Sequence, residues 1–268
     1  HNYLLIFTEF GKVFWKKVWE LPEGSKTSKG RPVQNLINIE PGDKIRAIIN
    51  VEDLKDEDYV NNHFVVMCTE SGTIKKTSLE AYSRPRRDGI IAINIKDGDS
   101  LLGAELTDGD SNIILANRNG RAIRFHESGA REMGRNTSGV RGMNLGKDDE
   151  IVDMVVIRNT HEATVLAISE NGFGKRSLVD DYREQSRGGK GVITLKVTKK
   201  TGNLIALKEV TDEDDLMIIT ERGKVIRMGC SGIRTMGRNT QGVRIMRLDD
   251  EGNIAAVTRV ANEEEEEV

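Results

Sequence analysis

The sequence predicts an all-β, propeller-like fold of four-stranded blades, and three features indicate it. Short apolar runs rich in β-branched residues recur along the chain, turns that end in glycine follow them, and few segments have helical periodicity. The units repeat about every fifty residues, with a first interval of about sixty, which is the size of a propeller blade.

Two glycines mark each repeat. The first ends a hairpin turn, and the Asn-Gly pairs that end at Gly120 and Gly172 are strong hairpin signals. In each repeat we expect two strands around the first glycine, a third strand through the second glycine, and a fourth strand after an acidic turn. The first glycines are Gly11, Gly72, Gly120, Gly172 and Gly223, and the second glycines are Gly30, Gly89, Gly139, Gly191 and Gly242.

The repeats predict one domain over residues 1–262, followed by an acidic tail at 263–268 that we expect to be disordered. Five blades, or repeats, are visible, and together they predict a closed or nearly closed ring. A β-sandwich is the alternative, but sandwiches do not repeat their turn chemistry at a fixed period. The approximate repeat boundaries are 1–54, 62–110, 111–160, 161–214 and 215–262.

Some connecting segments also carry expectations. The acidic insertion at 52–62 predicts a solvated loop, and helices are expected to be single turns, as at 177–182. Trp15, Trp19 and Phe125 follow the hairpins and are predicted to pack inside the blades.

Composition limits the compartment and the chemistry. The chain has 268 residues and a net charge of −3, and no apolar run approaches the roughly 18 residues that span a bilayer. Cys68 and Cys230 lack CxxC spacing, which favours a reduced, cytoplasmic protein. There is no signal-peptide pattern, and the start at His1 indicates a piece of a longer protein.

No catalytic motif emerges. Residues 172–177 lack the glycine spacing of a Walker A loop, there is no GxSxG elbow, and the histidines are scattered. We therefore expect no catalytic residue, no metal site and no cofactor in this chain.

The charges separate within each repeat, with basic residues before the second glycine and acidic residues after it. A basic band in step with the turns favours duplex DNA, a regular polyanion whose phosphates release counterions when Lys and Arg neutralise them. The glycines would let the loop backbone approach phosphate. Few aromatic residues and no recognition helix lie in the loops, so we expect binding that is largely independent of sequence.

Bending a duplex around such a band would cost on the order of several kcal/mol, which many phosphate contacts must offset. The predicted DNA-binding residues are Lys12, Lys16, Lys17, Lys26, Lys29, Arg31, Lys75, Lys76, Arg84, Arg86, Arg87, Arg121, Arg124, Arg135, Arg141, Lys175, Arg176, Arg187, Lys190, Lys224, Arg227, Arg238 and Arg244.

Two nearly identical segments carry a family resemblance: MGRNTSGVRGM at 133–143 and MGRNTQGVRIM at 236–246. With KVWELPEGSKTSKGRPVQNL at 17–36 and NGFGKRS at 171–177, they resemble repeats of the C-terminal domain of the bacterial DNA gyrase A protein. That family usually has six blades and a Gln-Arg-Arg-Gly-Gly-Lys-Gly box. The nearest match here, at 185–191, departs at its second position and is not treated as the box.

The resemblance implies a β-pinwheel whose blades exchange strands and whose basic edge wraps duplex DNA. It further implies a parent ATP-dependent type II topoisomerase that introduces negative supercoils. The implied partners are the rest of the gyrase A protein, with the catalytic tyrosine, and the gyrase B protein, in the bacterial cytoplasm near the nucleoid. The acidic tail resembles tails that modulate wrapping in some members.

Two alternatives stay open. The related C-terminal domain of topoisomerase IV orients DNA without strong wrapping. A propeller-type scaffold that binds proteins is the other, although the loops offer charge where such a scaffold would present apolar or aromatic residues.

Overall fold

The computed structural model describes residues 2–25, 29–158, 163–248 and 252–260. Lys26 and the acidic tail fall outside these ranges, so the predictions about them are not addressed by the structure. The chain forms two compact units. The first comprises His1–Ser111 and Glu127–Gly142, and the second comprises Asn112–His126 and Met143–Val268.

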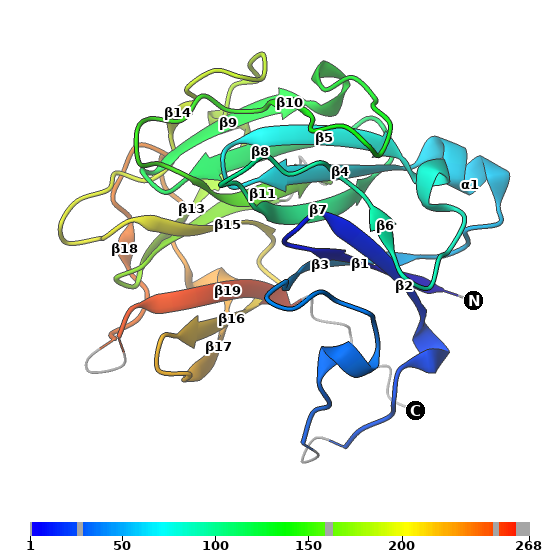
Figure 1. Cartoon of the computed structure of the whole chain (residues 1–268). Coiled ribbons are helices and arrows are strands. Elements are labelled where there is room, and N and C mark those ends of the chain that lie inside the picture. Colours follow the sequence, from blue (N-terminus) through cyan, green and yellow to red (C-terminus); the bar gives the residue numbers. More distant parts are fainter. Residues whose placement is uncertain (1, 26–28, 159–162, 249–251, 261–268) are drawn as a thin grey trace. The chain divides into compact units, whose positions relative to one another are not determined.

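The first unit contains two four-stranded antiparallel sheets (Figure 1). The first sheet has the strand order β3 (Ile45–Val51), β1 (Tyr3–Thr8), β2 (Lys12–Lys17) and β6 (Ile90–Ile91). The second sheet has the order β10 (Val140–Arg141), β5 (Thr73–Ser78), β4 (Phe64–Thr69) and β7 (Leu101–Thr107). Its helices are η1 (Val18–Glu20), η2 (Val33–Asn35), α1 (Glu57–Asn62), η3 (Leu79–Tyr82) and η4 (Glu127–Gly129).

The second unit contains three antiparallel sheets. Two are four-stranded: β11 (Ile151–Ile157), β8 (Asn112–Asn117), β9 (Arg121–His126) and β14 (Val192–Ile193), then β15 (Leu204–Val210), β12 (Thr164–Ser169), β13 (Phe173–Leu178) and β18 (Val243–Arg244). The described part of the last sheet has three strands: β17 (Val225–Gly229), β16 (Asp215–Thr220) and β19 (Ile254–Val260). The unit also has two single-turn helices, η5 (Val179–Asp181) and η6 (Cys230–Gly232).

The five described sheets confirm the all-β, propeller-type architecture of blades predicted from the repeats. Their apolar strands form the cores, where Leu5, Phe7 and Met67 of the first unit and Leu216 of the second are fully buried. None of the described helices is long and apolar enough to span a membrane.

A side-chain oxygen closes the first hairpin of every repeat. The residue three positions before the first glycine accepts a hydrogen bond from the backbone N–H just after that glycine. The sequence pattern had not revealed this cap, which fixes the turn against the strand end. The acceptors are Thr8, Thr69, Asn117, Ser169 and Thr220.

The predicted third strand differs from expectation. It is only two residues long, and it pairs with the second strand of the preceding repeat: β6 with β2, β10 with β5, β14 with β9 and β18 with β13. Each of these repeats therefore supplies three strands to one sheet and one short strand to the sheet before it, which is the exchange that the family resemblance implied.

Where strands are exchanged, the pairing explains why the repeats have glycine at these two positions. Gly120 (φ +80°) would place a Cβ 2.2 Å from the carbonyl oxygen of Leu195, and Gly191 (φ +67°) would place one 2.3 Å from that of Ala122. Any side chain there would be strained by its positive φ and would collide with the backbone of the neighbouring repeat. These glycines are therefore required by the close pairing of strands from neighbouring repeats. From the sequence we had expected them to let a phosphate approach the loop backbone.

The pattern stops at the two ends of the repeat array. A Cβ on Gly30 or Gly223 would meet nothing within 4 Å, and Val225 in β17 is half exposed. Within the described residues, the first repeat donates no short strand and the last sheet accepts none.

Two local expectations were wrong. The acidic insertion contains α1, because the side chain of Asp56 caps that helix by accepting from the N–H of Tyr59. Trp19 is 72% exposed, whereas Trp15 and Phe125 are buried as predicted.

We predict that Gly191→Ala lowers the free energy of unfolding by about 2 kcal/mol or more, since it combines a positive φ with a backbone collision. Gly237→Ala is the matched control, because a Cβ there meets nothing within 4 Å. Urea denaturation of both variants measures the difference. Equal stability of the two variants would contradict the role given to the exchanged strand.

Candidate nucleic-acid interface

The exchanged strands carry the basic loops onto the preceding sheets. We call residues 83–88, 132–138, 184–190 and 235–241, which run up to the second glycines, the basic loops. Three of them begin with a backbone hydrogen bond to the preceding repeat: Met133 N–H to the Lys76 carbonyl, Gln185 N–H to that of Arg124, and Met236 N–H to that of Arg176, each 2.8 Å. These loops are therefore anchored at both ends.

The cations four residues after the first glycine lie beneath or beside these loops. The Nζ of Lys76 is 2.7 Å from the Oε2 of the fully buried Glu127, and Arg176 is buried with Asp212 and Thr164 as partners. Arg124 donates to the side chain of Asn112 and to the carbonyls of Val179 and Tyr182.

Arg227 is exposed but lies 2.6 Å from a carboxylate oxygen of Asp215. This row of cations holds the sheets and loops together, and its buried members Lys76 and Arg176 cannot reach a ligand from these positions. Their predicted contact with phosphate is therefore not available to them as they lie.

Two further predicted contacts, Lys75 and Lys175, are fully buried. The ammonium of Lys75 donates to the carbonyls of Ala92 (2.6 Å) and Arg135, and that of Lys175 to the carbonyls of Gly237 (2.7 Å) and Arg238. Each lysine thus fastens one of the two Met-Gly-Arg-Asn-Thr loops from below. We call Lys75 and Lys175 the supporting lysines.

The supporting lysines explain why that loop sequence appears twice. At the matching positions under the other two basic loops stand Phe14 and Ile123, both buried and apolar. A loop that turns carbonyls inward requires a donor beneath it, whereas a loop over an apolar side chain does not. No sequence signal marked this role, because Lys75 and Lys175 lie in strands of mixed polar sequence, TIKKTS and FGKRSL.

Burial lowers the pKa of both supporting lysines to about 8. Desolvation is the main cause of both shifts. The charge of Asp181 opposes the shift of the Lys175 pKa, and a loop arginine, Arg135 or Arg238, lowers each pKa further. Near neutral pH they are charged, and their hydrogen bonds go to neutral carbonyls.

The remaining predicted residues divide by exposure. Lys12, Lys16 and Lys17 of β2 are partly exposed: Lys12 pairs with Glu40, Lys16 lies 3.7 Å from Glu20, and Lys17 lies over the rings of Tyr3 and Trp19. Arg121, Arg135, Arg187 and Arg238 are also partly exposed. The exposed members are Lys29, Arg31, Arg84, Arg86, Arg87, Arg141, Lys190, Lys224 and Arg244.

Two of the partly exposed arginines bond to neutral groups of the protein. The guanidinium of Arg121 donates to the carbonyls of Lys190 and Gly191, and that of Arg238 to the carbonyls of Asp181 and Ile193. Because carbonyls are neutral acceptors, these bonds orient the arginines without neutralising them. Arg238 in its loop, and Arg121 in strand β9, therefore contribute positive charge at the basic loops.

Carboxylates of the acidic turns bond to the first-hairpin turns. Asp43, Asp99 and Asp149 each accept a hydrogen bond from the backbone N–H of a first-hairpin turn, at 3.0, 3.0 and 3.3 Å. The carboxylates therefore gather at the hairpin ends of the strands, and the exposed loop cations lie along the exchanged edge. The expected separation of sign is incomplete, because Lys12 pairs with Glu40 and Arg118 lies 3.6 Å from Glu150.

A family profile described as "DNA gyrase C-terminal domain, beta-propeller" matches residues 2–52, 63–108, 111–158, 163–211 and 214–261. The chain belongs to the DNA gyrase C-terminal domain family. Two relatives are the DNA gyrase A proteins of Salmonella typhimurium, 41% identical, and Escherichia coli, 40% identical, each aligned over 267 residues. These alignments cover the whole chain and 30% of each relative, so the chain spans less than a third of their length.

Two solved structures resemble the fold of this family member closely. The C-terminal domain of a DNA topoisomerase IV has a TM-score of 0.87 at 27% identity, covering 97% of this chain and 79% of that one. A DNA gyrase A C-terminal domain has a TM-score of 0.82 at 26% identity, covering 97% and 82%.

The supporting lysines make stability depend on pH. A lysine with a pKa near 8 when folded and near 10.5 when unfolded binds fewer protons in the folded state between those values, so stability rises with pH there. We predict that the free energy of unfolding of the wild type, measured relative to a Lys75→Met/Lys175→Met variant, increases from pH 8 to pH 9.5. A flat difference would mean that these lysines are not desolvated.

Proposed function

We propose that the chain is a duplex-binding module that bends DNA along its basic loops in support of negative supercoiling by a gyrase. The observation that carries this proposal is the repeated placement of exposed arginines at one register. Arg141 and Arg244 lie two residues after the second glycine in β10 and β18, and Arg135 and Arg238 lie four residues before that glycine.

The loops suit a phosphate backbone in particular. They combine exposed guanidinium groups, which bind phosphate oxygens in a bidentate fork, with a rigid backbone attachment that fixes their spacing. Since described helices are single turns apart from α1, no helix of useful length is available to read bases in the major groove. Affinity would therefore come mainly from phosphate contacts and vary little with sequence.

The relatives support the same proposal. Their name assigns them to DNA gyrase, a type II topoisomerase, and we infer that this chain works with the rest of a gyrase A protein and with a gyrase B protein in the bacterial cytoplasm. Catalysis would lie in those partners, with this chain contributing the binding and bending of the duplex.

We predict that Arg135→Gln/Arg187→Gln/Arg238→Gln weakens duplex binding and reduces the slope of log K against log salt by about 2 to 3, as expected for the loss of three phosphate contacts. Electrophoretic shifts of a duplex at several salt concentrations measure both quantities.

The control variant is Lys44→Gln/Lys96→Gln/Lys147→Gln, which removes the same charge from exposed positions in the acidic turns. It should leave the slope nearly unchanged. Equal effects of the two triple variants would show that only overall charge matters and would refute a basic-loop interface.

The topoisomerase IV alternative has a specific observation in its favour, the high structural similarity to that C-terminal domain. A wrapping module changes the linking number when ligase seals a nicked circle in its presence, whereas a module that only orients DNA does not. A supercoiling assay on the complete parent enzyme then separates the two.

A further inference from the structure

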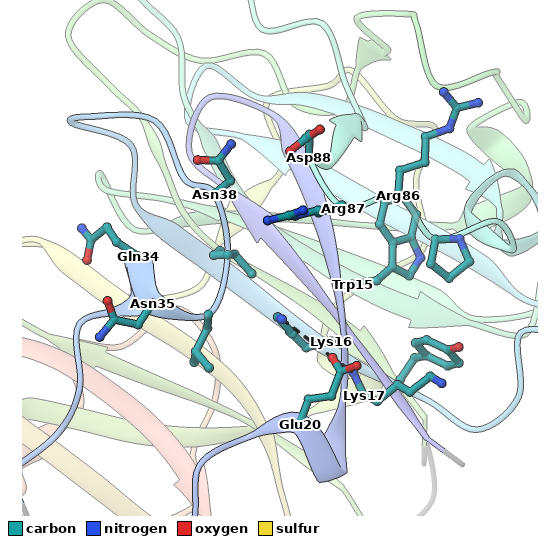
Figure 2. Close-up of a pocket in the computed structure, with 14 residues that line it drawn as sticks. Trp15, Lys16, Lys17, Glu20, Gln34, Asn35, Asn38, Arg86, Arg87 and Asp88 are labelled. Atoms are coloured by element: carbon teal, nitrogen blue, oxygen red, sulfur yellow. Dashed lines mark hydrogen bonds and ion pairs between the residues drawn. The ribbon is translucent and has the colours of Figure 1, made fainter.

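A cavity of about 710 Å³ opens beside β2 in the first unit (Figure 2). Its walls are residues 15–17 and Glu20, residues 34–38, and residues 85–88, with Tyr3 at one side. This volume lies within the roughly 300–1,000 Å³ typical of small-molecule sites.

A shortened basic loop leaves this space open. The second glycine follows the buried tyrosine by seven positions here, from Tyr82 to Gly89, and by nine in the fourth repeat, from Tyr182 to Gly191. In three other sheets the longer loop forms a parallel bridge to the residue four positions after the first glycine. Among the described residues, the corresponding residue of β2, Trp15, has no such bridge, so the shorter loop is not paired with that part of the strand.

The cavity carries an excess of positive charge. Lys16, Lys17, Arg86 and Arg87 line it against only two carboxylates, those of Glu20 and Asp88. In Figure 2 the side chains of Arg87 and Lys16 extend toward the segment that carries Asn38, while Arg86 and Lys17 point away from that space.

The two inward cations are loosely engaged. Lys16 lies 3.7 Å from the carboxylate of Glu20, and within the described residues no ion pair involves Arg87. A guanidinium and an ammonium facing one polar cavity, with the Asn38 carboxamide as a further donor, match the oxygens of a phosphate.

We propose that this cavity binds a phosphate-bearing anion, with Arg87 and Lys16 contacting the phosphate and Asn38 adding a hydrogen bond. The phosphate could belong to a DNA backbone or to a free nucleotide, since both present the same group. The pocket requires only its own walls, so it stands or falls independently of duplex binding by the longer loops.

The two tryptophans provide a built-in reporter. Trp15 precedes Lys16 in β2 and its buried indole N–H donates to the Tyr82 carbonyl at 2.9 Å, whereas Trp19 is exposed and outside the lining. Two-dimensional ¹H–¹⁵N spectra of the whole chain resolve both indole signals. The probes are inorganic phosphate, ADP and a short DNA duplex, each titrated separately.

The expected result is a saturable shift of the Trp15 signal that exceeds any shift of the Trp19 signal. Arg87→Gln or Lys16→Gln should weaken the interaction about tenfold or more, because each removes a charge-assisted contact. Arg86→Gln, the matched control, should have a smaller effect. Glu20→Gln should tighten binding, since it removes a competing carboxylate from Lys16.

The choice of probe identifies the source of the phosphate. A response to phosphate or ADP supports a free-anion site, and a response to the duplex alone supports a backbone contact. No response to any of the three probes, or an unchanged response in Arg87→Gln, overturns the proposal. Duplex binding without a Trp15 response would spare the proposed function and remove only the pocket.

Discussion

Each basic loop owes its position to a two-residue strand hydrogen-bonded to the sheet of the preceding repeat. That pairing brings two backbones so close that a side chain on Gly120 would collide with the Leu195 carbonyl and one on Gly191 with the Ala122 carbonyl. The described part of the last sheet includes no such strand, and there Val225 and Arg227 in β17 are exposed, whereas Ile74 and Lys76 at the same positions in β5 are buried. The exchanged strand thus both completes a sheet and fixes a loop.

The cations divide into two groups because of this arrangement. The cations of β5 and β13 are covered by the next loop, so they must find partners, as Lys76 does with Glu127 and Lys175 does with loop carbonyls. Those in the loop itself stay on the outside, as do Arg141 and Arg244 just beyond it. Covered cations set the geometry, and exposed cations are left to meet a ligand.

Sequence periodicity predicted the repeats and the hairpins, because both are local and recur in register. It did not show which sheet the short strand would join. A strand of two residues is too short for its alternation of apolar and polar side chains to indicate a partner strand. The burial of Lys75 and Lys175 was missed for a related reason: a lysine in a strand looks like a surface residue until the loop above it is placed. The cavity was missed because the sequence shows that one loop is two residues shorter, but not that the shorter loop leaves space beside β2.

Hydrogen exchange with and without a saturating duplex tests the central claim, that the loops held by exchanged strands are the surface that meets DNA. The account predicts slower exchange at 134–141 and 237–244, with the acidic turns at 40–44, 97–100 and 147–150 unchanged. Slower exchange at the acidic turns, or no change in the loops under conditions where a gel shift shows full binding, would contradict it.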